Sequence, residues 1–191
     1  MIDETKAMAY INSHISPKRV VHSVNTAVQA VALADIYGVD PVKAKIAGLL
    51  HDAGKGNAAQ ATRCGVTLDD IEKKDPELAH GRIGAAMIQM DLGLNDPEII
   101  SAITYHTTGK ADMSLLDKII YLADIIEPGR TFAGVEKIRA LANEDINAAM
   151  MVALEQTIAF VRSKGFPLHP KSVEAYQYLK EREEKNKLGL S

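Results

Sequence analysis

The dipeptide His51-Asp52 is the part of this sequence with the clearest capacity for chemistry. Imidazole nitrogen and carboxylate oxygen are common ligands of zinc, iron and manganese. Gly54 follows the pair and leaves backbone room nearby, and Lys55 adds a positive charge. A dipeptide alone is weak evidence because short motifs match by chance, and the alternative is a helix end with a stray histidine and aspartate. Other ligands elsewhere in the chain must therefore decide between the two.

Four further polar residues are conspicuous by helical spacing. His80, His106 and Asp124 fall on or beside apolar stripes that should face a core, whereas His22 lies on a polar stripe. A buried carboxylate is costly without a partner, so Asp124 requires a cation. Taken singly, a core histidine is more often a hydrogen-bonded structural residue than a ligand. Together with His51-Asp52 these residues come from five predicted helices, and metal sites in helical bundles are built from facing helices in this way.

The elements that must position these residues read as helices almost throughout. Ser16-Pro17, Asp40-Pro41 and Asp96-Pro97 are start signals, and Gly38 and Gly93 are stop signals. Residues 54–75 are less regular and predict a loop with short helical turns. The predicted helices cover about residues 3–14, 17–37, 41–52, 76–92, 97–106, 115–126, 135–142, 144–163 and 171 onward, ending in the charged run 180–187. With no alternating strand pattern, the sequence predicts an all-α bundle of eight to ten helices.

Length and composition place limits on function. At 191 residues, 47% of them hydrophobic and 25% charged, the chain predicts a single globular domain over 1–191. The net charge of −3 argues against general nucleic-acid binding. Cys64 is the only cysteine, which excludes an internal disulfide and a cysteine-based metal site. There is no signal-peptide pattern, and the longest apolar run, 119–126, is too short to span a bilayer. We therefore expect a soluble cytoplasmic protein.

The same residues suit phosphoryl transfer to water. Imidazoles and carboxylates from this group would leave a divalent ion mostly neutralised, with open positions at which it binds water and polarises a phosphoryl oxygen. Arg19, Lys55 and Arg130 each lie within a few residues of a candidate ligand and are predicted to bind phosphate. The alternative for each is an ordinary surface charge.

Five segments of the chain together carry a resemblance to a known family. They are Arg19 to Ser23, Leu49 to Lys55, His80-Gly81, Tyr105 to Gly109 and Tyr121 to Arg130. These segments resemble the HD-domain metal phosphohydrolases, helical proteins named after the His-Asp pair, and in particular the YqeK group of bacterial symmetrical diadenosine tetraphosphatases. The resemblance extends from about Ile15 to about Tyr178, with a metal-binding core over about 15–130 and C-terminal helices over 131–191.

The resemblance implies an HD-type fold, a metal ion and a nucleotide site. The metal would be iron, held by His22, His51, Asp52 and Asp124, although manganese, nickel and zinc accept the same ligands. Family members bind ADP or GDP and split diadenosine tetraphosphate into two ADP molecules. Catalytic roles are expected for Asp52, Lys55, His80 and His106. Nucleotide contacts are expected from Arg19, His22, Lys55, His80, His106, Thr107, Arg130 and Lys171.

Several alternatives stay open at this point. The metal set alone does not choose a substrate, so a phosphatase or phosphodiesterase acting on another nucleotide is a second enzyme hypothesis. A nucleotide-binding sensor without turnover and a helical interaction protein without an ion are the non-enzymatic ones. His80 and His106 could contact phosphate or complete a second metal site. The methionines of 144–163 could belong to the core or to a homodimer face, and the choice between adenine and guanine is not determined.

Overall fold

The computed structural model describes residues 2–189, and every regular element in that range is a helix. The prediction of an all-α bundle is confirmed, as is the predicted number of helices. A short 3-10 turn, η1, precedes α5. The elements are α1 (Glu4–His14), α2 (Pro17–Tyr37), α3 (Pro41–Leu50), α4 (Gln60–Arg63), η1 (Pro76–Ala79), α5 (His80–Leu92), α6 (Pro97–Tyr105), α7 (Leu115–Ile126), α8 (Val135–Glu144), α9 (Ile146–Lys164) and α10 (Pro170–Lys187).

Local sequence signals fix most helix ends. The Asp40 and Asp96 carboxylates accept hydrogen bonds from the first free backbone N–H groups of α3 and α6. Ser114 forms a reciprocal capping box at the start of α7. Gly38 and Gly93 adopt the left-handed conformation that ends α2 and α5. The start and stop signals of the sequence therefore act as predicted at these positions.

Some boundaries differ from the prediction, and the reasons are local. The helix predicted from Pro76 begins as the 3-10 turn η1 and becomes α-helical only at His80. His51 and His106 were predicted inside helices but occupy the position just after the last residue of α3 and of α6. Ser16 stands at the N-cap of α2 without a side-chain capping bond. The charged run 180–187 continues α10 to Lys187.

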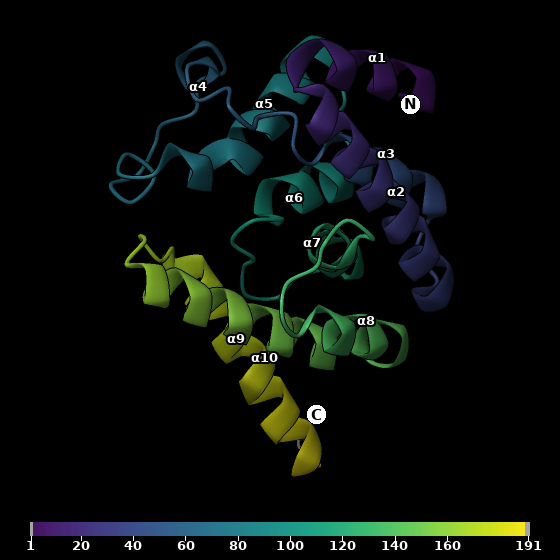
Figure 1. Cartoon of the computed structure of the whole chain (residues 1–191), viewed down its shortest axis with the longest axis vertical. Coiled ribbons are helices and arrows are strands. Elements are labelled where there is room, and N and C mark those ends of the chain that lie inside the picture. The colour runs from purple at the N-terminus through teal and green to yellow at the C-terminus, as the bar shows by residue number, and fades with distance from the viewer. Residues whose placement is uncertain (1, 190–191) are drawn as a thin grey trace.

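The helices surround α7, which lies near the middle of the molecule (Figure 1). α2 packs along α3 and also against α7, and α6 packs against α3, α5 and α7. On the other side of α7 lie α8 and α9, with α10 against α9. The main core runs continuously through this arrangement, and its largest fully buried side chains include Leu33, Leu50, Ile103, Ile120 and Leu122. No helix among the described residues is long and apolar enough to cross a membrane.

One close backbone approach fixes the segment that follows His51-Asp52. A Cβ atom added to Gly54 would lie 2.2 Å from the carbonyl oxygen of His80 and 2.5 Å from the backbone nitrogen of Gly84. Both neighbours are backbone atoms of the first turns of α5, which cannot rotate away. The glycine therefore holds the His51-Asp52 corner against the start of α5 at a separation that no side chain would permit.

This contact predicts that an alanine at position 54 destabilises the protein more than an alanine at position 65. Gly54→Ala should lower the free energy of unfolding by about 3 kcal/mol or more, because the inserted methyl group must displace backbone. Gly65→Ala is the control, because its position has a φ of +68° but open space around it. It should cost only about 1–2 kcal/mol of backbone strain. Urea unfolding of both variants measures the difference, and equal losses would contradict the packing argument.

Candidate metal centre

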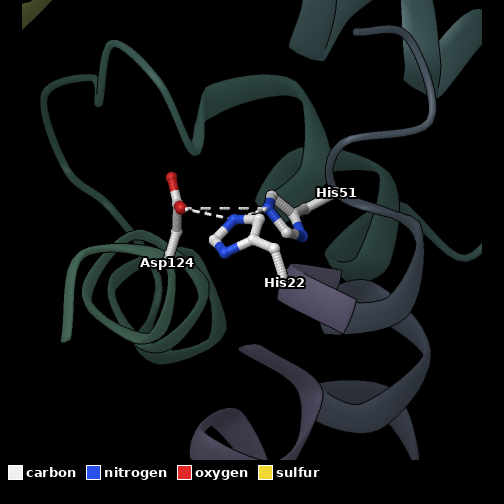
Figure 2. A group of neighbouring side chains, drawn as sticks. All are labelled: His22, His51 and Asp124. Carbon is white, nitrogen blue, oxygen red and sulfur yellow. Dashed lines mark hydrogen bonds and ion pairs between the residues drawn. The ribbon is translucent and has the colours of Figure 1, made fainter. Parts of the chain in front are cut away.

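Three predicted ligands from three different segments meet at one point. His22 comes from α2, His51 from the end of α3 and Asp124 from α7. The Nε2 atom of His22 lies 2.9 Å from Oδ1 of Asp124 and 3.2 Å from Nε2 of His51. Nε2 of His51 is 3.9 Å from the same Asp124 oxygen. Figure 2 shows the two rings turned toward each other and toward the carboxylate.

Asp52 lies between this group and a second pair of histidines. Its carboxylate oxygens are 3.9 Å from Nε2 of His51 and 4.0 Å from Nε2 of His22. Oδ1 of Asp52 is also 3.1 Å from Nε2 of His80 and 3.7 Å from Nε2 of His106. The two rings of the second pair approach each other at 2.8 Å between their Nε2 atoms. One buried carboxylate is thus shared by four imidazoles.

Backbone carbonyls orient three of the four rings. His51, His80 and His106 each bring Nδ1 within hydrogen-bond distance of the carbonyl oxygen three residues earlier. Since a carbonyl can only accept, Nδ1 carries a proton, and in the neutral ring Nε2 therefore presents a lone pair. For His51 and His106 these carbonyls, of Gly48 and Ile103, are among the last four of α3 and α6 and have no intrahelical partner. The same side chain therefore completes a helix end and aims a ligand atom inward.

The fourth ring is oriented by a residue to which the sequence analysis gave no role. Glu127 is buried, and its Oε1 atom lies 3.2 Å from Nδ1 of His22. Its other oxygen accepts from the side-chain amide of Asn25 at 3.1 Å and from the backbone of Gly129 at 2.6 Å. The sequence offers one indication of this network: Asn25 lies one turn after His22 on the same polar stripe of α2. Its partner is 102 positions away, and only the fold brings the two together.

This set of donors is incomplete without a cation. In their neutral forms, with Nδ1 protonated, the four rings would place Nε2 lone pairs opposite one another at 3.2 Å and 2.8 Å, next to two carboxylates. Facing lone pairs repel unless a proton or a metal ion lies between them. Ligand atoms bound to one ion at about 2.0–2.2 Å are themselves roughly 3–4 Å apart, as they are here. The C-terminal ends of α3 and α6 also face this point, and their partial negative charge favours a cation.

The protonation preferences have distinct causes. Burial lowers the pKa of His51 to about 4 and also lowers the pKa of His80. Burial opposes charge on His22 too, but its hydrogen bond to Asp124 prevails and raises its pKa. For Asp52 and Asp124, burial is outweighed by the neighbouring imidazoles, so both pKa values lie well below the ordinary range. The carboxylates are therefore ionised, and His51 is held neutral, which is the form that binds metal.

A cavity of about 740 Å³ opens from this centre, and its walls carry the predicted cations. Arg19 donates to Asp52 at 3.3 Å, and Arg130 donates to Asp124. Lys55 pairs with Glu77 at 3.0 Å. Thr107 also lines the cavity, and its hydroxyl lies 3.2 Å from Nε2 of His80.

Two predicted nucleotide contacts are not among the described residues that line this cavity. His106 is buried, but it stays within the centre, with its Nε2 atom 2.8 Å from that of His80. Lys171 is in the first turn of α10, where its Nζ atom is 5.7 Å from the ring centroid of Tyr105. The structure thus brings the other predicted site residues together and leaves Lys171 apart.

Comparison with known proteins identifies the arrangement. The sequence pattern of the family described as HD domain matches residues 19–129, which contain every residue of the centre. The chain belongs to the HD-domain family. A crystal structure from Clostridium acetobutylicum, described as a predicted HD superfamily hydrolase involved in NAD metabolism, is 41% identical. It superposes with a TM-score of 0.89, and the match covers 95% of this chain and 99% of that one.

Curated relatives match over almost the whole chain. A protein of Halalkalibacterium halodurans is 37% identical over 91% of this chain and 95% of its own length. One of Bacillus subtilis is 34% identical over 93% of this chain and 98% of its own length. Both are named bis(5'-nucleosyl)-tetraphosphatase, symmetrical. The HD domain and its cluster of histidines and aspartates together imply a divalent metal ion.

The buried neutral state of His51 predicts acid sensitivity of the metal-free protein. The unfolded chain takes up a proton at His51 below about pH 6.5, whereas the folded protein does so only near pH 4. Stability is therefore lost as pH falls through this window, by up to about 3 kcal/mol. Urea unfolding in the presence of a chelator should show this fall, and His51→Gln should make it shallower. Some fall should persist in the variant because His80 is also buried in its neutral form. The same slope in both proteins would contradict the assignment.

The support that Glu127 gives to His22 predicts a loss of metal affinity when it is removed. Glu127→Ala should weaken metal binding about 10- to 100-fold, as is typical for residues that orient a ligand. Glu174→Ala is a suitable control, because that side chain is exposed on α10. Titration of chelator-stripped protein with Mn²⁺ measures both affinities, and wild-type affinity in Glu127→Ala would exclude the orienting role.

Proposed function

We propose that this protein is a metal-dependent hydrolase that cleaves symmetrical dinucleoside tetraphosphates, converting diadenosine tetraphosphate and water into two ADP. The observation that carries the proposal is the convergence of four imidazoles and two carboxylates beside Arg19, Lys55 and Arg130. The names of relatives that match over more than nine-tenths of the chain point to the same substrate class.

His22, His51, Asp52 and Asp124 are the residues that would hold the ion. Iron is the proposed metal, and manganese, nickel and zinc accept the same nitrogen and oxygen donors. When bound, a divalent ion supplies positive charge that polarises a phosphoryl oxygen and lowers the pKa of water. The arginines and Lys55 supply charge elsewhere along the tetraphosphate chain, arginine through two parallel hydrogen bonds and lysine as a point charge.

His80 and His106 are proposed to act on the phosphates. Hydrolysis forms a bond between a water oxygen and an inner phosphorus and breaks the central phosphoanhydride bond, and the departing ADP oxygen needs a proton or hydrogen bond. His80 lines the cavity, and once its Nε2 lone pair has taken up the proton released by the attacking water it can donate that proton to the departing oxygen, with His106 and Thr107 beside it. The lone pairs of the same two rings also fit a second ion that shares Asp52, so the metal-to-protein ratio distinguishes the two roles.

A nucleotide panel tests the proposal. Protein purified without chelator is analysed for its metal content and then incubated with dinucleoside polyphosphates, nucleoside phosphates and cyclic dinucleotides. Diadenosine tetraphosphate should yield two ADP. The appearance of ATP and AMP would indicate a different cleavage position, and turnover of another nucleotide alone would favour the second enzyme hypothesis. Tight ADP binding without any turnover would indicate a sensor.

Removal of the shared carboxylate should abolish metal and activity together. Asp52→Ala takes away the one group that contacts both histidine pairs. We expect loss of the ion and a fall in turnover of more than about a hundredfold, beyond the effect of losing a residue that only orients a ligand. Asp70→Ala is the control, since that side chain is 92% exposed. Full activity in Asp52→Ala would refute the assignment.

A further inference from the structure

A second, apolar groove begins where the metal cavity ends. It has a volume of about 760 Å³ and lies between the loop that follows α7 and the helices α8 and α9. Phenylalanine rings, an amide and a hydroxyl contribute to its walls. The lining includes Arg130, Phe132, Ile138, Gln156, Thr157 and Phe160.

Arg130 joins the two cavities. It lines both of them, and its guanidinium donates to Asp124 at the metal centre through Nη2 and to the Asp124 carbonyl through Nε at 2.9 Å. A phosphate chain that passes Arg130 on its way out of the metal cavity is therefore directed into the groove. The positive charge at this junction suits a ligand that is anionic where it enters and apolar farther along.

The groove has the chemistry of a nucleoside site. Phe132 and Phe160 are 42% and 56% exposed, although both are large apolar side chains. Aromatic rings stack on nucleobases, and the amide of Gln156 and the hydroxyl of Thr157 can bond to base edges or ribose. Gly134 makes room for this amide, because a Cβ atom there would lie 2.5 Å from Nε2 of Gln156. The volume is within the usual range for small-molecule sites.

We infer that this groove binds the second nucleoside of a symmetrical dinucleoside tetraphosphate. The inference rests on the proposed function. Cleavage at the central bond places two phosphates and one nucleoside on each side of the metal centre, so the substrate extends past the centre in both directions. The groove takes the half that leaves along Arg130, and the other half stays in the metal cavity, whose lining includes Lys55 and Thr107.

Substrates with one and with two nucleosides separate this role from a general effect on activity. Diadenosine tetraphosphate and adenosine 5'-tetraphosphate carry the same phosphate chain, but the second has a single adenosine that can occupy the opposite side. In Phe160→Ala, the ratio of kcat/KM for diadenosine tetraphosphate to that for adenosine 5'-tetraphosphate should fall about 5- to 100-fold, mainly through KM, the usual effect of losing one base-stacking contact. Phe132→Ala should shift the ratio in the same direction.

Phe166→Ala is the matched control. Phe166 is also 56% exposed but lies in the connector between α9 and α10, outside the groove, so its ratio should equal that of the wild type. An unchanged ratio in Phe160→Ala, or equal losses on both substrates, would overturn the inference. A change from dimer to monomer in Phe160→Ala, measured by light scattering, would overturn it in favour of a subunit interface.

Failure of the proposed function can be distinguished from failure of the groove assignment. A wild-type protein that turns over neither substrate overturns the proposed function. Calorimetry on the same variants with diadenosine tetraphosphate and with ADP then decides the groove assignment. If Phe160→Ala binds diadenosine tetraphosphate more weakly than the wild type but binds ADP equally well, the second nucleoside site is supported. Equal affinities of wild type and variant for diadenosine tetraphosphate exclude it.

Discussion

The carboxylate of Asp52, placed between two pairs of imidazoles, is the constraint on which the centre depends. In its neutral form each neighbouring ring presents a lone pair at Nε2, because it donates through Nδ1 to a carbonyl or to Glu127. A buried group of Lewis bases without a counter-charge is unfavourable in any fold. The fold nevertheless holds these imidazoles and carboxylates together. A cation that balances their negative charge would therefore be bound at this point.

Helix ends help to hold these side chains in place. His51 and His106 stand just beyond α3 and α6 and satisfy carbonyls that the helices leave free. The glycine contact between Gly54 and α5 then sets the distance between the His51-Asp52 corner and His80. Stability and ligand geometry are therefore supplied by the same contacts, so the histidines are also part of the scaffold.

Much of this could be predicted from sequence, because the strongest signals are local. Aspartate followed by proline starts a helix at Asp40-Pro41 and at Asp96-Pro97, and a charged residue such as Asp124 inside an apolar run is visible without coordinates. The role of Glu127 was not predictable, since its meaning depends on His22, which lies 105 positions earlier. The 3-10 turn before His80 and the separation of Lys171 from the cavity also escaped prediction, because both are determined by packing between elements.

The order of the ligands along the chain has a consequence for biosynthesis. His22 leaves the ribosome early, whereas Asp124 lies on α7, after two-thirds of the chain has been made. A nascent chain therefore cannot bring the proposed ligands together until α7 has emerged and packed against α2 and α6. An ion captured at that stage would act as a late cross-link among helices, favouring the folded state by mass action. Metal supply would thereby influence how much of the newly made protein matures, in addition to how fast it works.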